Sequence, residues 1–161
     1  MNTSENVFRF AERKDTELVL DFIKRIAAYE EMPDAVKYTK ESLEEWLFDR
    51  KKGEVLFVLE GNTEVGFCLF YETLPGYIGR GGLYVEDLFV YPEYRGKGYG
   101  KALLKKMAEI AIERDCGRLE WLCLKWNVNS IDFYKGMGAT SMDSCVSFRV
   151  EDDALKNMLD K

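Results

Sequence analysis

The residues best suited to chemistry lie between Val85 and Gly100, where a strand, a turn and a glycine-rich helix start follow one another. Three glycines, at positions 96, 98 and 100, alternate with Lys97 and Tyr99 behind Arg95. Glycine lets backbone N–H groups approach an anion closely, and the unpaired amides and dipole of a first helical turn attract negative charge. The stretch therefore predicts a phosphate-binding loop at a helix N-terminus.

Spacing excludes two common phosphate loops. A dinucleotide loop requires G-x-G-x-x-G, and here Gly100 comes one residue too early. A P-loop requires G-x-x-x-x-G-K-[ST], but Lys101 is followed by Ala102. From local sequence alone, the remaining alternative is a glycine-rich turn that only packs a helix against a strand.

Composition limits the chemistry further. The chain of 161 residues has no histidine, four scattered cysteines without a C-x-x-C pair, and a net charge of −6. Proton transfer must then use Glu, Asp, Tyr, Cys, Lys or water, and Ser-His-Asp catalysis and histidine-ligated metals are excluded. We expect no metal and reduced cysteines in a cytoplasmic protein. The acidity argues against nucleic acid as a partner and favours cationic ligands.

The elements that must position the loop predict an α/β fold in a single domain, residues 1–161, with residues 1–6 loosely ordered. Strands are expected at Val7–Ala11, Glu54–Glu60, Thr63–Thr73, Leu83–Val90 and Arg118–Lys125 and in a hairpin over 139–150. Helices are expected after Asp15, Thr39 and Gly98, at Ser130–Met137 with Asn127 or Asn129 as its cap, and at Asp152–Leu159. Hairpins beside a βαβ crossover predict a mixed, mostly antiparallel sheet of about seven strands with helices on both faces. The apolar runs are too short to cross a membrane, and the first residues lack a signal-peptide pattern.

The loop Arg95–Gly100 resembles the Q/R-x-x-G-x-G/A loop with which GCN5-related N-acetyltransferases (GNATs) bind the pyrophosphate of acetyl-CoA. The expected element order is also that of this family. Further motifs, Tyr84-Val85-Glu86-Asp87-Leu88-Phe89-Val90 and Trp126-Asn127-x-x-Ser130-Ile131-x-Phe133-Tyr134-Lys135, are similar to the spermidine/spermine N1-acetyltransferase branch, which includes thialysine acetyltransferases. The resemblance covers almost the whole chain and implies the acyltransferase fold and a homodimer.

The resemblance implies catalytic roles for Tyr134 and Glu86. Tyr134 matches the tyrosine that protonates the departing CoA thiolate, for which a phenol of pKa about 10 is a plausible acid; the alternative is a core tyrosine. Glu86 matches a glutamate that helps to deprotonate the substrate amine, and its alternative is to bind the cation without moving protons. Asp87 and Glu30 match acidic positions that bind the amine, or they are solvated charges. Strand alternation places Glu86 and Asp87 on opposite faces unless a bulge intervenes.

The resemblance also implies acetyl-CoA as co-substrate. The arm of pantetheine would bind to the backbone of the strand end, where it parts from Arg118–Lys125 in a V-shaped splay. Asn127 would contact the coenzyme or cap a short helix. The implied coenzyme-binding residues are Leu88, Phe89, Val90, Arg95, Gly96, Lys97, Gly98, Tyr99, Gly100, Asn127 and Tyr134.

The loop Tyr77–Gly82 and the pair Val128-Asn129 depart from the polyamine enzymes, which have Trp-Ile-Gly-Lys and Glu-Pro there. The acceptor is therefore open among polyamines, diamines and thialysine-like or lysine-like amines. We expect direct acetyl transfer to a primary amine in a ternary complex. The alternatives are a non-catalytic acyl-CoA-binding or sensing module and a family member that acts on a protein N-terminus or another amine.

Overall fold

The computed structural model describes residues 6–160 and contains two compact units, Met1–Leu122 and Cys123–Lys161. Each unit is described by itself. The expectation of a loosely ordered start falls, except for Asn6, outside the described residues. The prediction of one domain remains a prediction.

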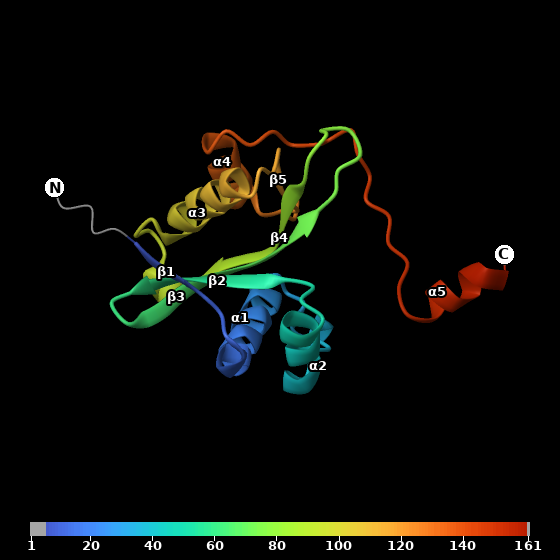
Figure 1. The fold of residues 1–161 in the computed structure, drawn as a ribbon, viewed down its shortest axis with the longest axis horizontal. Helices are drawn as coiled ribbons and strands as arrows, with labels where there is room; N and C mark the ends of the chain where they lie inside the picture. Colours follow the sequence, from blue (N-terminus) through green and yellow to red (C-terminus); the bar gives the residue numbers. More distant parts are fainter. Residues whose placement is uncertain (1–5, 161) are drawn as a thin grey trace. The chain divides into compact units, whose positions relative to one another are not determined.

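The first unit is built on a five-stranded sheet in the order β1-β2-β3-β4-β5 (Figure 1). The strands are β1 (Val7–Phe10), β2 (Glu54–Glu60), β3 (Thr63–Thr73), β4 (Gly82–Val90) and β5 (Leu119–Trp121). Neighbours from β1 to β4 pair antiparallel, and β4 and β5 pair parallel. The prediction of a mixed, mostly antiparallel sheet is confirmed.

The helices of the first unit are α1 (Thr16–Tyr29), α2 (Lys40–Glu44), which continues into a π-helical turn (Glu45–Asp49), and α3 (Tyr99–Glu113). The second unit contains α4 (Val128–Gly136) and α5 (Asp153–Asn157). Short 3-10 turns occur at Arg13–Asp15, Pro33–Ala35, Pro92–Tyr94 and Met158–Asp160. Within the described residues, no helix is long and apolar enough to cross a membrane.

The prediction of about seven strands is wrong, because the sheet of the described residues has five. The segment 139–150, expected to be a hairpin, forms no strand. Val146 and Phe148 of this segment are 75% and 91% exposed, so the alternating pattern acquires no packed face. The expected strand Arg118–Lys125 is shorter, since β5 ends at Trp121.

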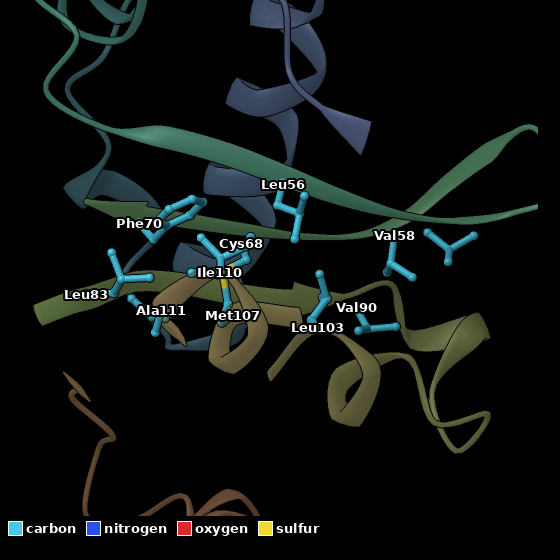
Figure 2. Packing of buried hydrophobic residues seen from close by; sticks show 12 residues of the cluster. Leu56, Val58, Cys68, Phe70, Leu83, Val90, Leu103, Met107, Ile110 and Ala111 are labelled. Atoms are coloured by element: carbon cyan, nitrogen blue, oxygen red, sulfur yellow. The ribbon is translucent and has the colours of Figure 1, made fainter. Parts of the chain in front are cut away.

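Two apolar clusters cover the two faces of the sheet, as expected when alternate residues of a strand point to opposite sides. On one face Leu103, Met107 and Ile110 of α3 pack against strand residues that include Cys68 and Phe70 (Figure 2). The other cluster joins α1, α2 and the π-helical turn to the sheet through Val19, Phe22, Ile23, Leu43, Leu47, Val55, Phe57, Phe67 and Phe89. The prediction of helices on both faces is thus confirmed, and the end of β4 is packed on both sides, through Val90 in one cluster and Phe89 in the other.

Candidate active site

A β-bulge interrupts β4 at Glu86. Leu69 of β3 lies opposite Asp87, but the next residue of β3, Phe70, lies opposite Val85. Glu86 therefore has no partner in the register. A bulge inserts one extra residue into a strand and shifts the alternation of its side chains beyond that point.

The packing of β4 shows which way the two acidic side chains point. Val85 belongs to the cluster on the α3 face, so the next residue, Glu86, points to the α1 face. Phe89 belongs to the cluster on the α1 face, so alternation counted backwards places Asp87 on the α1 face as well. The sequence placed Glu86 and Asp87 on opposite faces unless a bulge intervened, and the structure contains that bulge.

Three carboxylates gather on this face. Burial and the negative charges of Glu86 and Glu30 raise the pKa of Asp87 to about 7. Glu30, which directly follows α1, is partly buried, and its burial raises the pKa of its own carboxyl. Within the described residues, no lysine or arginine forms an ion pair with any of the three. The group is therefore an uncompensated negative site that suits a cationic ligand.

A tyrosine that the sequence analysis missed holds Glu86. The Tyr71 hydroxyl donates a hydrogen bond to Glu86 Oε2 at 3.3 Å, and the Tyr71 ring stacks on Tyr84 with centroids 5.3 Å apart. Burial and the charge of Glu86 raise the pKa of Tyr71 to about 12, so Tyr71 stays a hydrogen-bond donor at neutral pH. The two strands could be recognised from the sequence, but the contact between Tyr71 and Glu86 depends on the register in which the strands pair.

Beside the bulge, β4 loses its neighbour on one edge. Its pairing with β5 runs only from Leu83–Leu119 to Val85–Trp121. Further on, Tyr91 N donates to Val65 O of the β3 end at 3.0 Å, so alternation directs the backbone groups of Leu88 and Val90 to the open edge. Leu88, Phe89 and Val90 were predicted to bind pantetheine, and of these Leu88 and Val90 direct backbone groups to the open edge of β4.

Arg95 fixes the start of the loop that follows β4. Its Nε donates to Val90 O at 3.0 Å. Its guanidinium carbon lies 4.9 Å from the ring centroid of Tyr29 and 5.1 Å from that of Phe89. These contacts tie the loop to the end of α1, next to Glu30.

The glycine loop has the backbone that its sequence predicted. Gly96 and Gly98 have φ angles of 77° and 90°, which favour glycine, and Gly98 is the N-cap of α3. No acidic side chain occupies the first turn of α3. Lys97 Nζ and the Tyr99 hydroxyl both contact Glu60 Oε1, at 2.8 and 2.9 Å, which anchors the loop to the end of β2. The amides of the first turn are thus available to a phosphate.

The second unit contains two of the predicted site residues. Asn127 Oδ1 accepts a hydrogen bond from Ser130 N at 3.3 Å, so this side chain caps α4. Tyr134 lies on the same helix, partly buried, with its ring 5.4 Å from that of Phe133. The structure brings Glu30, Glu86 and Asp87 together, whereas the roles of Asn127 and Tyr134 stay predictions.

This combination of a helix-flanked mixed sheet, a strand with one open edge and a glycine loop at a helix N-terminus defines an acyltransferase fold. The Acetyltransferase (GNAT) family profile matches residues 19–139. The chain belongs to the GNAT acetyltransferase family, as its sequence motifs suggested, and is an acetyl-transferring enzyme.

Within this family, the chain is similar to several curated acetyltransferases. The chain is 34% identical over 167 residues to the thialysine N-epsilon-acetyltransferase of Sus scrofa, covering 96% of this chain and 98% of the relative. It is 34% identical to the spermidine/spermine N(1)-acetyltransferase-like protein 1 of Homo sapiens, over 84% of this chain and 21% of that one. An L-ornithine N5-acetyltransferase of Arabidopsis thaliana is 42% identical over 56% of this chain and 40% of its own.

Solved structures agree on the fold. An integron cassette protein from V. cholerae superimposes with a TM-score of 0.80 at 26% identity, covering 98% of this chain and 99% of its own. An aminoglycoside acetyltransferase from a soil metagenome, solved with sisomicin, gives a TM-score of 0.76 at 20% identity, over 91% and 96% of the two chains. The second likeness concerns the fold alone.

GNAT acetyltransferases use acetyl-CoA, and the loop fits its phosphates. A Cβ added at Gly96, Gly98 or Gly100 would meet no atom within 4 Å, so the backbone of the loop is open to a ligand. Within residues 6–160, no group of three or more His, Cys, Asp or Glu side chains could hold a metal ion.

The raised pKa of Asp87 predicts a pH-dependent stability. The folded protein binds a proton at Asp87 more tightly than the unfolded chain does, so Asp87 destabilises the fold as pH rises from about 4 to about 7. Asp87→Asn removes this effect. From pH 4 to pH 8, we expect the wild type to lose about 1–3 kcal/mol of unfolding free energy relative to Asp87→Asn. Urea unfolding of both proteins measures this difference, and parallel pH profiles would contradict it.

Proposed function

We propose that this protein transfers the acetyl group of acetyl-CoA directly to a primary amine of a small cationic acceptor, either a polyamine, a diamine or a thialysine-like or lysine-like amine. The observation that carries the proposal is the group of three carboxylates, Glu86 and Asp87 of β4 and Glu30 after α1, which form no ion pair with a lysine or arginine among the described residues. A cationic amine bound there would neutralise the site. The names of three relatives, a thialysine N-epsilon-acetyltransferase, an L-ornithine N5-acetyltransferase and a spermidine/spermine N(1)-acetyltransferase-like protein, support the same class of acceptor.

Acetyl-CoA would bind to the opposite side of the same segment. The amides of Gly98, Tyr99 and Gly100 at the start of α3 would hold the pyrophosphate. Lys97 would add positive charge on exchanging its contact with Glu60 for the phosphate. The backbone groups of Leu88 and Val90 would bind the pantetheine arm as a strand-like ligand along the open edge. Asn127 would add a further contact to the coenzyme.

In the reaction, the acceptor must lose a proton before its nitrogen can attack. The new C–N bond to the acetyl group then forms as the C–S bond breaks, and Tyr134 supplies a proton to the leaving thiolate. The first proton lost by the amine passes to the carboxylate group around Glu86, and the second, which the nitrogen releases after the C–N bond has formed, passes to water. Both substrates are bound at once, so no acyl-enzyme is required.

Cys68 is poorly suited to carry the acetyl group as a covalent intermediate. Cys68 is fully buried, and burial raises the pKa of its thiol, which suppresses the thiolate needed of a nucleophile. It packs in the core against α3 (Figure 2). Homodimer formation and a cytoplasmic location remain predictions from the family resemblance.

A panel of amines tests the proposal against its rival, a non-catalytic acyl-CoA-binding module. The panel contains spermidine, short diamines, thialysine, lysine, ornithine and a peptide with a free N-terminus, and CoA release is measured with acetyl-CoA as donor. We expect turnover with the small cationic amines and little with the peptide. Binding of acetyl-CoA without turnover of any amine would favour the rival.

Tyr134→Phe tests the acid. Removal of one hydroxyl should lower kcat by about 10²–10⁴-fold near neutral pH, because the thiolate then leaves without a proton donor. Binding of acetyl-CoA should change little. Tyr38→Phe removes the hydroxyl of an exposed tyrosine to which no role is assigned, so it is the matched control and should keep wild-type kcat. Unchanged activity of Tyr134→Phe would remove Tyr134 from the mechanism.

Gly98→Ala tests the loop. A Cβ at φ 90° strains the backbone by about 1–2 kcal/mol, and relief of that strain would move the amides that face the phosphate. We expect acetyl-CoA affinity, measured by calorimetry, to fall about tenfold or more. Gly61→Ala introduces a Cβ at φ 62° in the β2–β3 turn and is the matched control for strain alone. Equal affinities for both variants would argue against phosphate binding at this loop.

A further inference from the structure

We infer that Asp87, rather than Glu86, accepts the proton that the acceptor amine loses, and that Glu86 and Tyr71 tune this proton transfer. The inference rests on the proposed function and assigns one step of it. The family resemblance gave the proton to Glu86, with Asp87 as a binding residue. The bulge makes the exchange of roles possible, because it brings both side chains to the same face.

The two carboxylates lie in different surroundings. Glu86 is exposed, and its Oε2 accepts the hydrogen bond of Tyr71. Asp87 is partly buried and lies within the electrostatic reach of both Glu86 and Glu30. A carboxyl group that is kept from water by the chain and flanked by like charges holds its proton at neutral pH more readily than an exposed one.

The groups around Asp87 come from three elements. β4 supplies Glu86, α1 leads into Glu30, and β3 supplies apolar Leu69 directly opposite and, from the other face, the thiol of Cys68. The two charges that act on Asp87 are both negative. The guanidinium of Arg95 stacks on Tyr29 and Phe89, and no described cation forms an ion pair with Asp87. These surroundings give Asp87 a pKa of about 7, where a general base is most effective at neutral pH.

Position along the strand favours the same residue. Asp87 directly precedes Leu88, whose backbone groups face the open edge proposed for pantetheine. An amine held between Glu30 and Asp87 would therefore lie beside the strand segment that carries the acetyl donor. Glu86 lies one residue further from Leu88 along the strand. It would bind a second positive charge of the acceptor, either directly or through water.

The proposed step balances. The ammonium group of the acceptor gives one proton to a carboxylate oxygen of Asp87, and its nitrogen keeps the electron pair. That pair forms the C–N bond to the acetyl carbonyl carbon, the C–S electron pair leaves with sulfur, and Tyr134 protonates the thiolate. The nitrogen, which then carries a positive charge, releases its second proton to water and leaves a neutral amide. Asp87 and Tyr134 then exchange protons with water to restore the starting state.

The test compares Asp87→Asn with Glu86→Gln in pH profiles of kcat and kcat/KM, with the best amine of the panel. For the wild type we expect kcat/KM to rise with pH through an apparent pKa near 7. This rise of kcat/KM with pH is the ascending limb of the profile. The Asp87→Asn enzyme should lack the ascending limb, and its kcat at saturating amine should be about 10²–10⁴-fold lower than that of the wild type. Glu86→Gln should keep the limb but shift it to lower pH, because one negative neighbour of Asp87 is gone, and should raise KM more than it lowers kcat.

Further variants separate chemistry from folding. Asp87→Glu should recover part of the kcat and the limb, and acetyl-CoA affinity should be unchanged in both Asp87 variants. Tyr71→Phe frees Glu86 and should shift the limb without removing it. Glu93→Gln removes an exposed carboxylate outside the group and should behave as wild type.

Two results would overturn the inference alone: an Asp87→Asn enzyme that keeps the limb and most of its kcat, or a Glu86→Gln enzyme that loses the limb. Absence of turnover by the wild type with every amine would instead contradict the proposed function, and the inference with it. These outcomes differ in the wild-type measurement, so the failure of one proposal is distinguishable from the failure of the other.

Discussion

The extra residue at Glu86 is the constraint on which the rest of the site depends. It turns Asp87 to the α1 face, where Glu30 follows the end of the helix. The pairing of β4 with β5 also ends at Val85, immediately before the bulge. A bulge bends a strand and increases its local twist, which suits the end of a paired edge. One insertion therefore accompanies both an acidic face and an open backbone edge.

Without a ligand, the three carboxylates of the acidic face destabilise the folded state. Like charges repel, and the chain provides no described cation to offset Glu30, Glu86 and Asp87. The sheet tolerates the group because large apolar clusters fix both faces around it. Elsewhere in the first unit, partly buried acids are paired, as Asp15 is with Arg9. This contrast between paired and unpaired acids indicates a binding site, since native proteins store local destabilisation where they function.

Much of the first unit could be predicted from the sequence. Alternation and turn residues located β2, β3 and β4, and the glycines located the start of α3, because these signals are local. The bulge could not be located, since a period of two is equally compatible with either register until the packing of Val85 and Phe89 is known. Tyr71 was missed for the same reason. The expected strand in 139–150 failed because alternation alone does not supply a neighbouring strand.

The two halves of the proposed site use different parts of the chain, and the sequence motifs name residues of both. The donor side depends on backbone groups, of Leu88, Val90 and the glycine loop, so a short motif and a helix start are sufficient to recognise it. The acceptor side depends on side chains whose effect is collective, because the proton affinity of Asp87 is set by Glu86 and Glu30 together. Exchange of one such side chain alters the acceptor site and leaves the backbone edge intact. In the proposed function, such a family would keep one acetyl donor and change its amine, and Glu30, Glu86, Asp87 and their neighbours would set the acceptor of this member.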